Sequence, residues 1–398
     1  MMSLMLICSI YKEGEKSLER IYVDHAATSP MHPRVIESVT NVMKTHFGNP
    51  SSIHSFGREA RHIVDEARDF LAKSIGASPH EIIITSGGTE ADNYAIIGIA
   101  EANQHIGRHI ITTEIEHHAV LHTCKQLEKK GYEITYLPVD EQGTISVESV
   151  KKALRDDTIL VTVMFGNNEV GTLQPIEEIG ELLKDHPSVF HTDAVQAYGL
   201  VNIDVQQMNI DLLSVSAHKI NGPKGIGFLY AKKDIRLAPL IYGGEQERKR
   251  RAGTENVASI AGFKVAVEVS HAEREQRIQQ YSQYKETLVN HLKKLEINFF
   301  INGSLENSLP HVLNLSFPGT DVESMLVNLD LAGVSASSGS ACTAGSIEPS
   351  HVLVAMYSNE SERIRNSIRF SFGLFNTVEQ IERVANTTAS IVKRLTNK

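Results

Sequence analysis

The segment Leu212-Leu213-Ser214-Val215-Ser216-Ala217-His218-Lys219 sets our first expectation for the architecture of this chain. Its first five residues have the length and apolar character of a strand that is buried on both faces, and a lysine follows closely. Partial loss of hydration at such a position lowers the pKa of a lysine and favours Schiff-base chemistry on its amine. For this segment alone, a lysine that reaches from the sheet edge into water is the more common case.

Six other short apolar runs show the same strand pattern, and amphipathic stretches separate several of them. Strand–helix alternation of this kind builds a mostly parallel sheet that helices cover on both faces. We therefore predict an α/β fold with a mostly parallel seven-stranded sheet. The predicted strands are Glu81–Thr85, His109–Thr113, Glu133–Leu137, Ile159–Met164, Val189–Thr192, Leu212–Ser216 and Gly227–Tyr230, and the helical patterns include Arg58–Ile75, Ala91–Ala102, Val120–Lys130 and Ile176–Lys184.

The character of the sequence changes near Ala258. A long charged stretch with helical patterning runs from there to Leu295, and strand-like His311–Phe317 and Ser367–Ser371 follow. A chain of 398 residues is long for one core, so we expect two domains. The large domain is predicted at residues 28–262, and a smaller α+β domain at residues 1–27 and 263–398, with residues 1–17 as an extension.

The composition, with 41% hydrophobic and 22% charged residues, is that of an ordinary globular protein. The net charge of −9 argues against a polyanion held by bulk electrostatics, so we expect no direct nucleic-acid partner. The three cysteines Cys8, Cys124 and Cys342 form no disulfide framework and fit a reducing cytoplasm. The apolar opening Met1–Ile10 is shorter than the about 20 residues that span a bilayer, so we expect no membrane association.

Two segments that follow predicted strands carry polar groups suited to a charged ligand. In Ser86-Gly87-Gly88-Thr89-Glu90, glycines at a strand-to-helix turn let backbone N–H groups approach an anion, although the same residues also form ordinary turns. Asp193 ends another strand, and Gln196 lies three residues further on. A carboxylate there is either a helix cap or ion-pair partner, or a group that keeps a pyridine nitrogen protonated.

Cys342 lies in a run of eleven small residues, from Ser335 to Gly345. Such a run cannot pack a conventional core, so we expect an exposed and reactive thiol. A second cluster, His117, His118, His122 and Cys124, resembles a set of metal ligands, and His118 and His122 have the i, i+4 spacing of zinc ligands. Because no further ligand is evident, we expect no metal site.

In their order and combination, these segments resemble the cysteine desulfurases of the NifS/IscS type, a branch of the aspartate-aminotransferase-like enzymes that use pyridoxal phosphate (PLP). The resemblance extends from about Ile21 to the C-terminus. The motifs that carry it are Tyr22–Thr28, Phe47–Ser52, Thr85–Asn93, Glu116-His117, Asn167–Glu169, His191–Gln196, Ser216–Gly225, Arg251–Thr254 and Ser337–Thr343.

The resemblance implies roles for the matching residues. Lys219 would bind PLP covalently, Asp193 would pair with the ring nitrogen, and Cys342 would accept sulfur. His117 would stack on the ring and transfer protons. The other implied contacts are Gln196 and Asn168 at the ring hydroxyl, Gly88, Thr89, Ser216 and His218 at the phosphate, Thr254 at the phosphate site of a second subunit, and Asn168 and Arg369 at the substrate, whose carboxylate the guanidinium would clamp.

The implied reaction removes sulfur from L-cysteine and yields L-alanine and a persulfide on Cys342. The persulfide would pass to a protein acceptor, either an iron–sulfur scaffold or a tRNA-thiolating enzyme. The implied assembly is a homodimer in the cytoplasm.

Three other functions compete with that of a cysteine desulfurase. An aminotransferase of the same fold needs no reactive cysteine, so the Cys342 segment argues against it. A selenocysteine lyase would use Cys342 equally well and stays open. A non-catalytic scaffold is disfavoured because Lys219, Asp193, His117, Arg369 and Cys342 are all retained.

Overall fold

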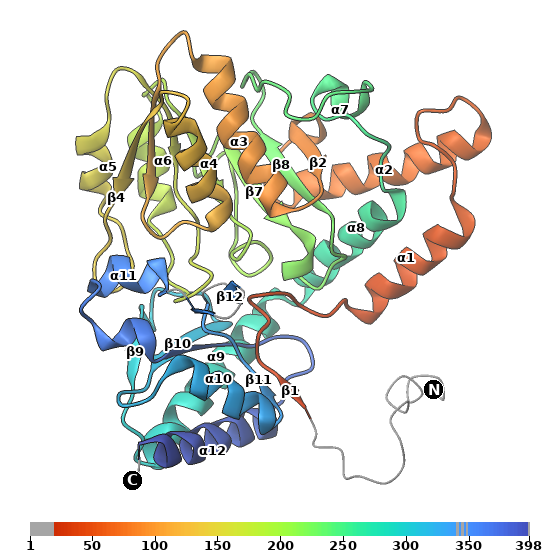
Figure 1. The fold of residues 1–398 in the computed structure, drawn as a ribbon. Helices are drawn as coiled ribbons and strands as arrows, with labels where there is room; N and C mark the ends of the chain where they lie inside the picture. The colour runs from red at the N-terminus through yellow and green to blue at the C-terminus, as the bar shows by residue number, and fades with distance from the viewer. Residues whose placement is uncertain (1–19, 340–341, 344–345, 348, 397–398) are drawn as a thin grey trace.

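The structure of the chain, a computed structural model, describes residues 20–339, 342–343, 346–347 and 349–396. The extension predicted at residues 1–17 lies outside them. Figure 1 shows a large sheet with its helices in the upper part of the molecule and a smaller group of helices and strands below. Among the described helices, none has the length and apolar character needed to span a membrane.

A central sheet of seven strands confirms the predicted α/β fold. Most neighbouring strands of this sheet are parallel. The exception is the strand at Gly227–Ala231, which is antiparallel to both strands beside it. The spatial order is β2 (Ile82–Thr85), β8 (Gly227–Ala231), β7 (Leu212–Ser216), β6 (Val189–Asp193), β5 (Thr158–Thr162), β3 (His109–Thr113) and β4 (Glu133–Leu137).

Both faces of this sheet are buried because consecutive side chains of a strand point to opposite sides. Ile83 and Leu212 pack in one cluster with residues of α3 (Gly88–Asn103) and α4 (His118–Glu128). Their neighbours Ile82 and Leu213 belong to a separate, larger cluster. That cluster is completed by helices α1 (Pro33–Thr45), α2 (Ser55–Lys73), α5 (Val147–Ala153), α6 (Ile176–Leu183) and α8 (Val257–Ala272), while α7 (Gln246–Lys249) lies in the loop before α8.

Three helices begin after a histidine. His32, His54 and His117 are the N-caps of α1, α2 and α4, and each ring accepts a hydrogen bond on Nδ1 from a backbone N–H of the first turn, at 3.2, 3.2 and 3.1 Å. Serine, threonine, aspartate and asparagine are the usual N-caps, so the sequence pattern placed the start of α2 at Arg58, after its observed start.

The C-terminal part of the chain forms a second core and includes the N-terminal strand. Ile21 and Val23 are buried in one cluster with Leu288, Leu313 and Phe370. The predicted domain boundary near residue 262 stays a prediction. The elements of this part are β1 (Ile21–Tyr22), α9 (Arg274–Lys294), β9 (Phe300–Asn302), β10 (Val312–Ser316), α10 (Val322–Leu331), β11 (Val334–Ser335), β12 (Cys342–Thr343), β13 (Ser346–Ile347), α11 (His351–Tyr357), β14 (Ser367–Ser371) and α12 (Val378–Leu395), with short 3-10 turns at Pro79–Glu81, Ala217–Lys219 and Glu362–Arg365 along the chain.

The helical stretch that begins near Ala258 is divided between the two cores. It forms α8 and α9, and Glu273 separates them with a non-helical φ of −105° and ψ of 5°. Phe263 of α8 packs in the large cluster under the sheet, whereas Leu288 of α9 packs in the second core. The break lets one continuous segment connect the two cores.

We predict that Phe263→Ala lowers the free energy of unfolding by about 3–5 kcal/mol, because it leaves a cavity in a close-packed interior. Phe263 is fully buried, and its ring stacks on that of Phe228 with the centroids 5.8 Å apart. Denaturant unfolding at fixed protein concentration measures the change. Leu331→Ala is the control, because Leu331 is 76% exposed and its truncation should change stability by less than about 0.5 kcal/mol.

Candidate active site

A cavity of about 410 Å³ lies between the carboxyl ends of the central strands and the second core. This is the place where open parallel sheets bind ligands. Ten predicted cofactor and substrate residues line it: Gly88, Thr89, His117, Asn168, Asp193, Gln196, Ser216, His218, Lys219 and Arg369. Thr254 does not line the cavity of its own chain, and the side chain of Cys342 lies outside the described part of the structure.

Lys219 ends the short turn that follows β7, which places its amine at the cavity wall. Nζ donates hydrogen bonds to the backbone carbonyls of Ala26 at 2.5 Å and Ala27 at 2.8 Å. Burial, helped by the charge of Arg369, lowers the pKa of Lys219 to about 8. A larger fraction of the amine is therefore unprotonated near neutral pH than for an exposed lysine, as covalent attachment to an aldehyde requires.

Asp193 ends the neighbouring strand β6 and is buried. Its Oδ1 accepts a hydrogen bond from the amide of Val195 at 2.9 Å. Burial raises the pKa of this carboxyl group, and Lys219 opposes the rise. A cationic ring nitrogen in the cavity would offset the burial of the carboxylate, so the site fits a protonated pyridine.

The part of the cavity wall at the start of α3 fits a phosphate group. The 16-residue helix α3 begins at Gly88, beside Ser216. A Cβ on Gly88 would lie 2.7 Å from Cγ2 of Val195, so only glycine lets the backbone pack this closely. Thr89 adds a hydroxyl group, and the ring of His218 lies 3.1 Å from Oγ1 of Thr28. Backbone N–H groups at the start of a helix, together with hydroxyl groups, bind phosphate well.

His117 also lines the cavity and caps α4, and a ring nitrogen lies within 4.8 Å of carboxyl oxygens of Asp92 and Asp193. Its Nδ1 accepts a hydrogen bond from the amide of Ala119 at 3.1 Å, which assigns the ring proton to Nε2. The ring is open to the cavity but enclosed by protein, and this enclosure, with the charge of Lys219, lowers the pKa of His117 to about 4. The neutral ring can therefore stack on an aromatic ligand and hold a proton at Nε2.

Arg369, in the middle of β14, is held from two sides. Nη2 pairs with Oδ1 of Asp24 at 2.8 Å, and Nη1 donates to the carbonyl of Asn168 at 2.9 Å. Its Nε is buried and has no partner among the described residues. A fixed guanidinium at the cavity wall suits recognition of a carboxylate. Gln196 is also fixed, because its amide donates to the carbonyl of Ala26 at 2.9 Å.

The sequence did not single out the buried carboxyl groups Asp92, Glu116 and Glu169, or Asp24 as the partner of Arg369. Burial and the charge of Asp193 raise the pKa of Asp92, and burial raises that of Glu116 to about 8. A helical pattern with one acidic residue on an otherwise apolar face could have indicated Asp92. The other three lie in motifs that match the family, but no periodicity indicates the long-range contacts of Asp24 with Arg369 and of Glu116 with Met164.

The cluster of His117, His118, His122 and Cys124, whose residue types resemble metal ligands, is not arranged around one point. The rings of His118 and His122 stack with centroids 4.9 Å apart, and Cys124 is a buried thiol whose pKa burial raises to about 12. Among the described residues, the group whose possible ligand atoms lie within 4.8 Å of one another is Asp92, His117 and Asp193. These residues surround the proposed place of the cofactor ring.

Comparison with known proteins identifies the family. The model of the class-V aminotransferases matches residues 21–384. This chain belongs to the class-V aminotransferase family, in its NifS/IscS-type branch. The chain is 64% identical to a protein named IscS 1 from Bacillus subtilis. The match covers 95% of this chain and 100% of the Bacillus subtilis protein. The cysteine desulfurase IscS of Dictyoglomus turgidum is 47% identical over 95% of both chains. A solved NifS-like protein superposes with a TM-score of 0.88 at 36% identity, covering 94% of this chain and all of its own.

We predict that Lys219→Ala removes the covalently bound PLP and its yellow colour while the fold persists, because no other lysine among the described residues lines this cavity. Borohydride reduction followed by peptide mapping identifies the attachment site. Lys224→Ala is the matched control, since Lys224 is exposed and close in sequence. A reduced cofactor found on Lys224 would show that the assignment is wrong.

Proposed function

We propose that this class-V aminotransferase family member is a PLP-dependent cysteine desulfurase that leaves sulfur on Cys342 as a persulfide. The observation that carries the proposal is the composition of the cavity. Lys219, Asp193 and Arg369 meet there, and Ser337 and Gly339, which begin the Cys342 segment, form part of its wall. The desulfurase relatives match nearly the full length of the chain, which supports the same activity.

The residues of the cavity would divide the work of binding. Lys219 would hold PLP covalently, Asp193 would keep its ring nitrogen protonated, and the start of α3 would bind its phosphate. Arg369 and Asn168 would hold the carboxylate of L-cysteine and orient its sulfur toward Cys342. Bound PLP supplies an electron sink for the electron pair that departing sulfur leaves on carbon.

Sulfur transfer is a nucleophilic displacement by Cys342. Its thiolate attacks the substrate sulfur, a sulfur–sulfur bond forms, and the carbon–sulfur bond breaks with its electron pair on carbon. Either Lys219 or Nε2 of His117 then returns a proton to that carbon. In sum, cysteine and the enzyme thiol become alanine and an enzyme persulfide, with no external oxidant.

The persulfide would serve a protein acceptor in the cytoplasm, where thiols stay reduced. We propose an iron–sulfur scaffold or a tRNA-thiolating enzyme, since both need sulfur at this oxidation level. Transfer of labelled sulfur from the loaded enzyme to each purified candidate distinguishes the two.

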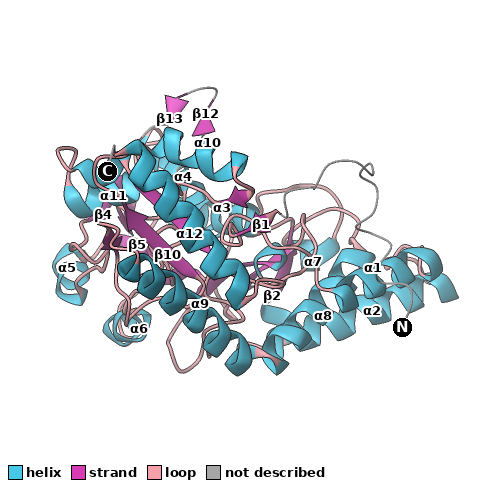
Figure 2. Ribbon diagram, turned by 90° about the horizontal axis from the view of Figure 1, so that it is seen from below, coloured by secondary structure: helices cyan, strands magenta, loops and turns pink. Residues whose placement is uncertain are grey.

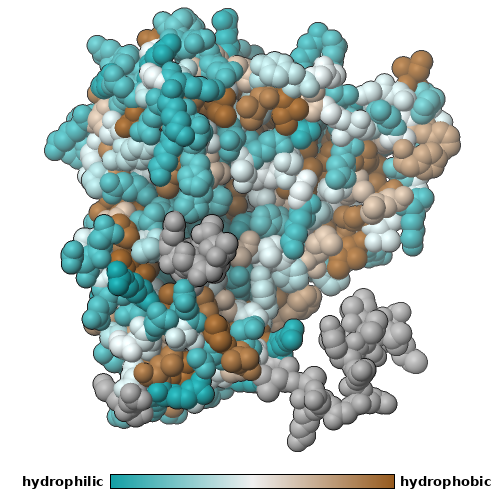
Figure 3. All heavy atoms as spheres, viewed as in Figure 1, coloured by the Kyte–Doolittle hydropathy of each residue, from teal (hydrophilic) through white to brown (hydrophobic). Residues whose placement is uncertain are grey.

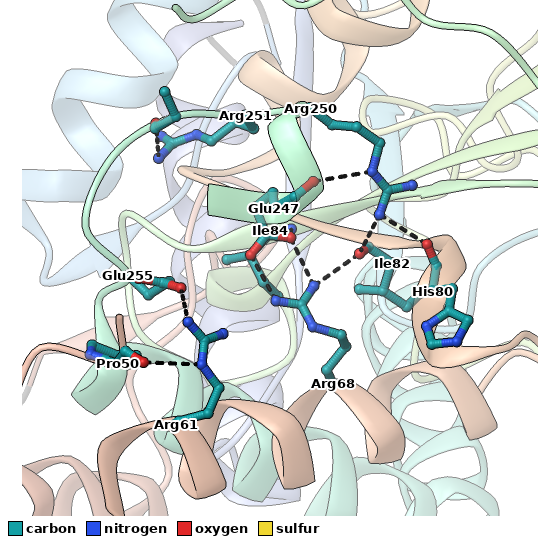
Figure 4. A network of polar contacts seen from close by, with 11 residues as sticks. Pro50, Arg61, Arg68, His80, Ile82, Ile84, Glu247, Arg250, Arg251 and Glu255 are labelled. Carbon is teal, nitrogen blue, oxygen red and sulfur yellow. Dashed lines mark hydrogen bonds and ion pairs between the residues drawn. The ribbon is translucent and has the colours of Figure 1, made fainter. Parts of the chain in front are cut away.

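A homodimer with shared active sites is the assembly that we propose. Thr254 is exposed and lies on a loop that its own subunit fixes firmly (Figure 4). Arg68 of α2 makes two hydrogen bonds of 2.7 Å to the buried carboxylate of Glu247, and Arg61 binds Glu255 at 3.0 Å. This anchor offsets the strain of residues 247–249, whose φ angles are 47°, 60° and 67°. The loop thus presents Thr254 outward, as a contribution to the cavity of a partner requires.

An exposed apolar patch supports the same assembly. It covers α1, α2 and their connection, and Figure 3 shows its brown surface at the right of the molecule. Patches of this kind mark interaction surfaces in soluble proteins. Its members and their exposed fractions are Ile36 47%, Met43 70%, Phe47 77%, Ile53 91% and Phe56 50%. Because α2 also carries Arg61 and Arg68, the patch and the Thr254 loop belong to one region of the fold.

We predict that Cys342→Ser separates the two halves of the reaction. The variant should stay yellow and respond spectrally to cysteine, but it should release no alanine, because a hydroxyl group supplies no nucleophile at neutral pH. Wild-type protein given cysteine without acceptor should gain a persulfide on the Cys342 peptide, detected by mass spectrometry. Cys124→Ser is the control. Undiminished alanine release from cysteine by the Cys342 variant would overturn the desulfurase assignment.

We predict that Lys219→Ala and Thr254→Ala proteins, each impaired alone, regain part of the activity when they are unfolded together and refolded. One site of the hybrid dimer then contains both wild-type residues. The measurement is alanine released from cysteine, against each variant refolded by itself. A fully active monomer in light scattering would contradict the shared site.

A further inference from the structure

Glu169 is a buried carboxyl group with no role in the chemistry described above. Only 1% of the residue is exposed, and Oε1 has no hydrogen-bond partner among the described residues. Burial raises the pKa of Glu169 to about 7, while a hydrogen bond from Ser350 and the charge of Arg369 oppose the rise. Burying a carboxyl group is costly, so its position calls for a compensating function.

One contact of Glu169 is with Gly339, at the start of residues 339–350, the part of the chain that carries Cys342. A Cβ added to Gly339 would lie 2.4 Å from Cγ and 2.7 Å from Cδ of Glu169, so the two residues already pack as closely as glycine allows. Gly339 has a φ of 83°, a conformation that suits glycine. Two residues earlier, Ser337 exchanges backbone hydrogen bonds with Arg369, at 2.6 and 3.2 Å. The start of the segment is therefore fixed beside the substrate arginine.

A second contact lies at the end of the same segment. The hydroxyl group of Ser350 lies close enough to the carboxyl group of Glu169 to lower its pKa, and it accepts the amide of Leu353 at 3.1 Å, where it caps α11. The next residue, His351, bonds to the backbone carbonyl of Glu116 at 2.9 Å. Figure 2 shows the paired strands β12 and β13, which lie between these two ends, at the edge of the molecule.

We propose that Glu169 is a positioning residue for sulfur transfer: its carboxyl group holds the two ends of the Cys342 segment, Gly339 and Ser350, together beside the substrate site. The inference rests on the proposed desulfurase function and goes one step further. Glu169 also follows Asn168, whose carbonyl fixes Arg369. The same turn of backbone therefore sets the position of the substrate carboxylate and of both ends of the segment that brings the nucleophile.

The test compares two substitutions of similar size. Glu169→Met fills the same volume against Gly339 and buries no charge, so it should fold, but it offers no acceptor to Ser350. Glu169→Gln keeps the acceptor. Glu148→Met is the surface control, because the Glu148 side chain is 59% exposed.

We expect Glu169→Met to bind PLP normally and to keep the KM for cysteine within about threefold, while kcat and the single-turnover rate of persulfide formation fall at least tenfold, about 1.4 kcal/mol in activation free energy. Glu169→Gln should stay within about threefold of wild type in every measurement. A general loss of structure would change PLP content and KM as well, so this separation identifies positioning.

Three results would overturn the inference: persulfide formation by Glu169→Met at the wild-type rate, loss of cysteine binding by that variant, or Glu169→Gln as slow as Glu169→Met. In each of these cases the proposed function stands if wild-type protein converts cysteine to alanine. If wild-type protein makes no alanine from cysteine, the proposed function itself fails.

Discussion

The ion pair between the buried Arg369 and the half-buried Asp24 connects parts of the chain that lie far apart in sequence. Asp24 follows the N-terminal strand, and Arg369 lies in the last strand, 345 residues later. The same guanidinium binds the backbone of Asn168 in the large sheet region, and its own backbone pairs with Ser337. Removing Asp24 would leave the buried charge of Arg369 without its carboxylate, which is destabilising. The shape of the cavity depends on this pair, because N-terminal, central and C-terminal walls all meet at it.

The cavity gathers ionisable groups that would repel or destabilise one another in an ordinary core. Asp92 and Asp193 are both buried, and the charge of Arg369 helps to lower the pKa of Lys219. Such an arrangement is costly in the free protein and is typical of sites that a charged ligand completes. A cofactor with a cationic ring nitrogen and an anionic phosphate would place a positive charge beside Asp193 and a negative charge at the start of α3.

The sequence predicted the sheet well because its signal is local. The strands His109–Thr113, Glu133–Leu137 and Leu212–Ser216 have their predicted bounds, since each is a short apolar run that ends in turn residues. The run Ile159–Met164 was predicted too long: β5 ends at Thr162, and the amide of Met164 bonds to the buried carboxylate of Glu116 at 2.8 Å. Lys219 and Asp193 could be placed together because β6 and β7 are adjacent parallel strands. The contacts of Glu169 could not, because no periodicity relates it to Gly339 or Ser350.

The histidine caps His32 and His117 make the starts of α1 and α4 sensitive to acid, because burial lowers the pKa of both rings. A ring that accepts a backbone N–H on Nδ1 cannot do so once that nitrogen carries a proton. For His117 the folded chain holds the pKa at about 4, below the ordinary 6.5, so protons bind the unfolded chain more readily. The stability that this ring contributes is therefore complete above about 6.5 and disappears as the pH falls toward 4. Because the same ring faces the cofactor cavity, acidification would loosen the first turn of α4 and place a positive charge against the bound ring in a single protonation.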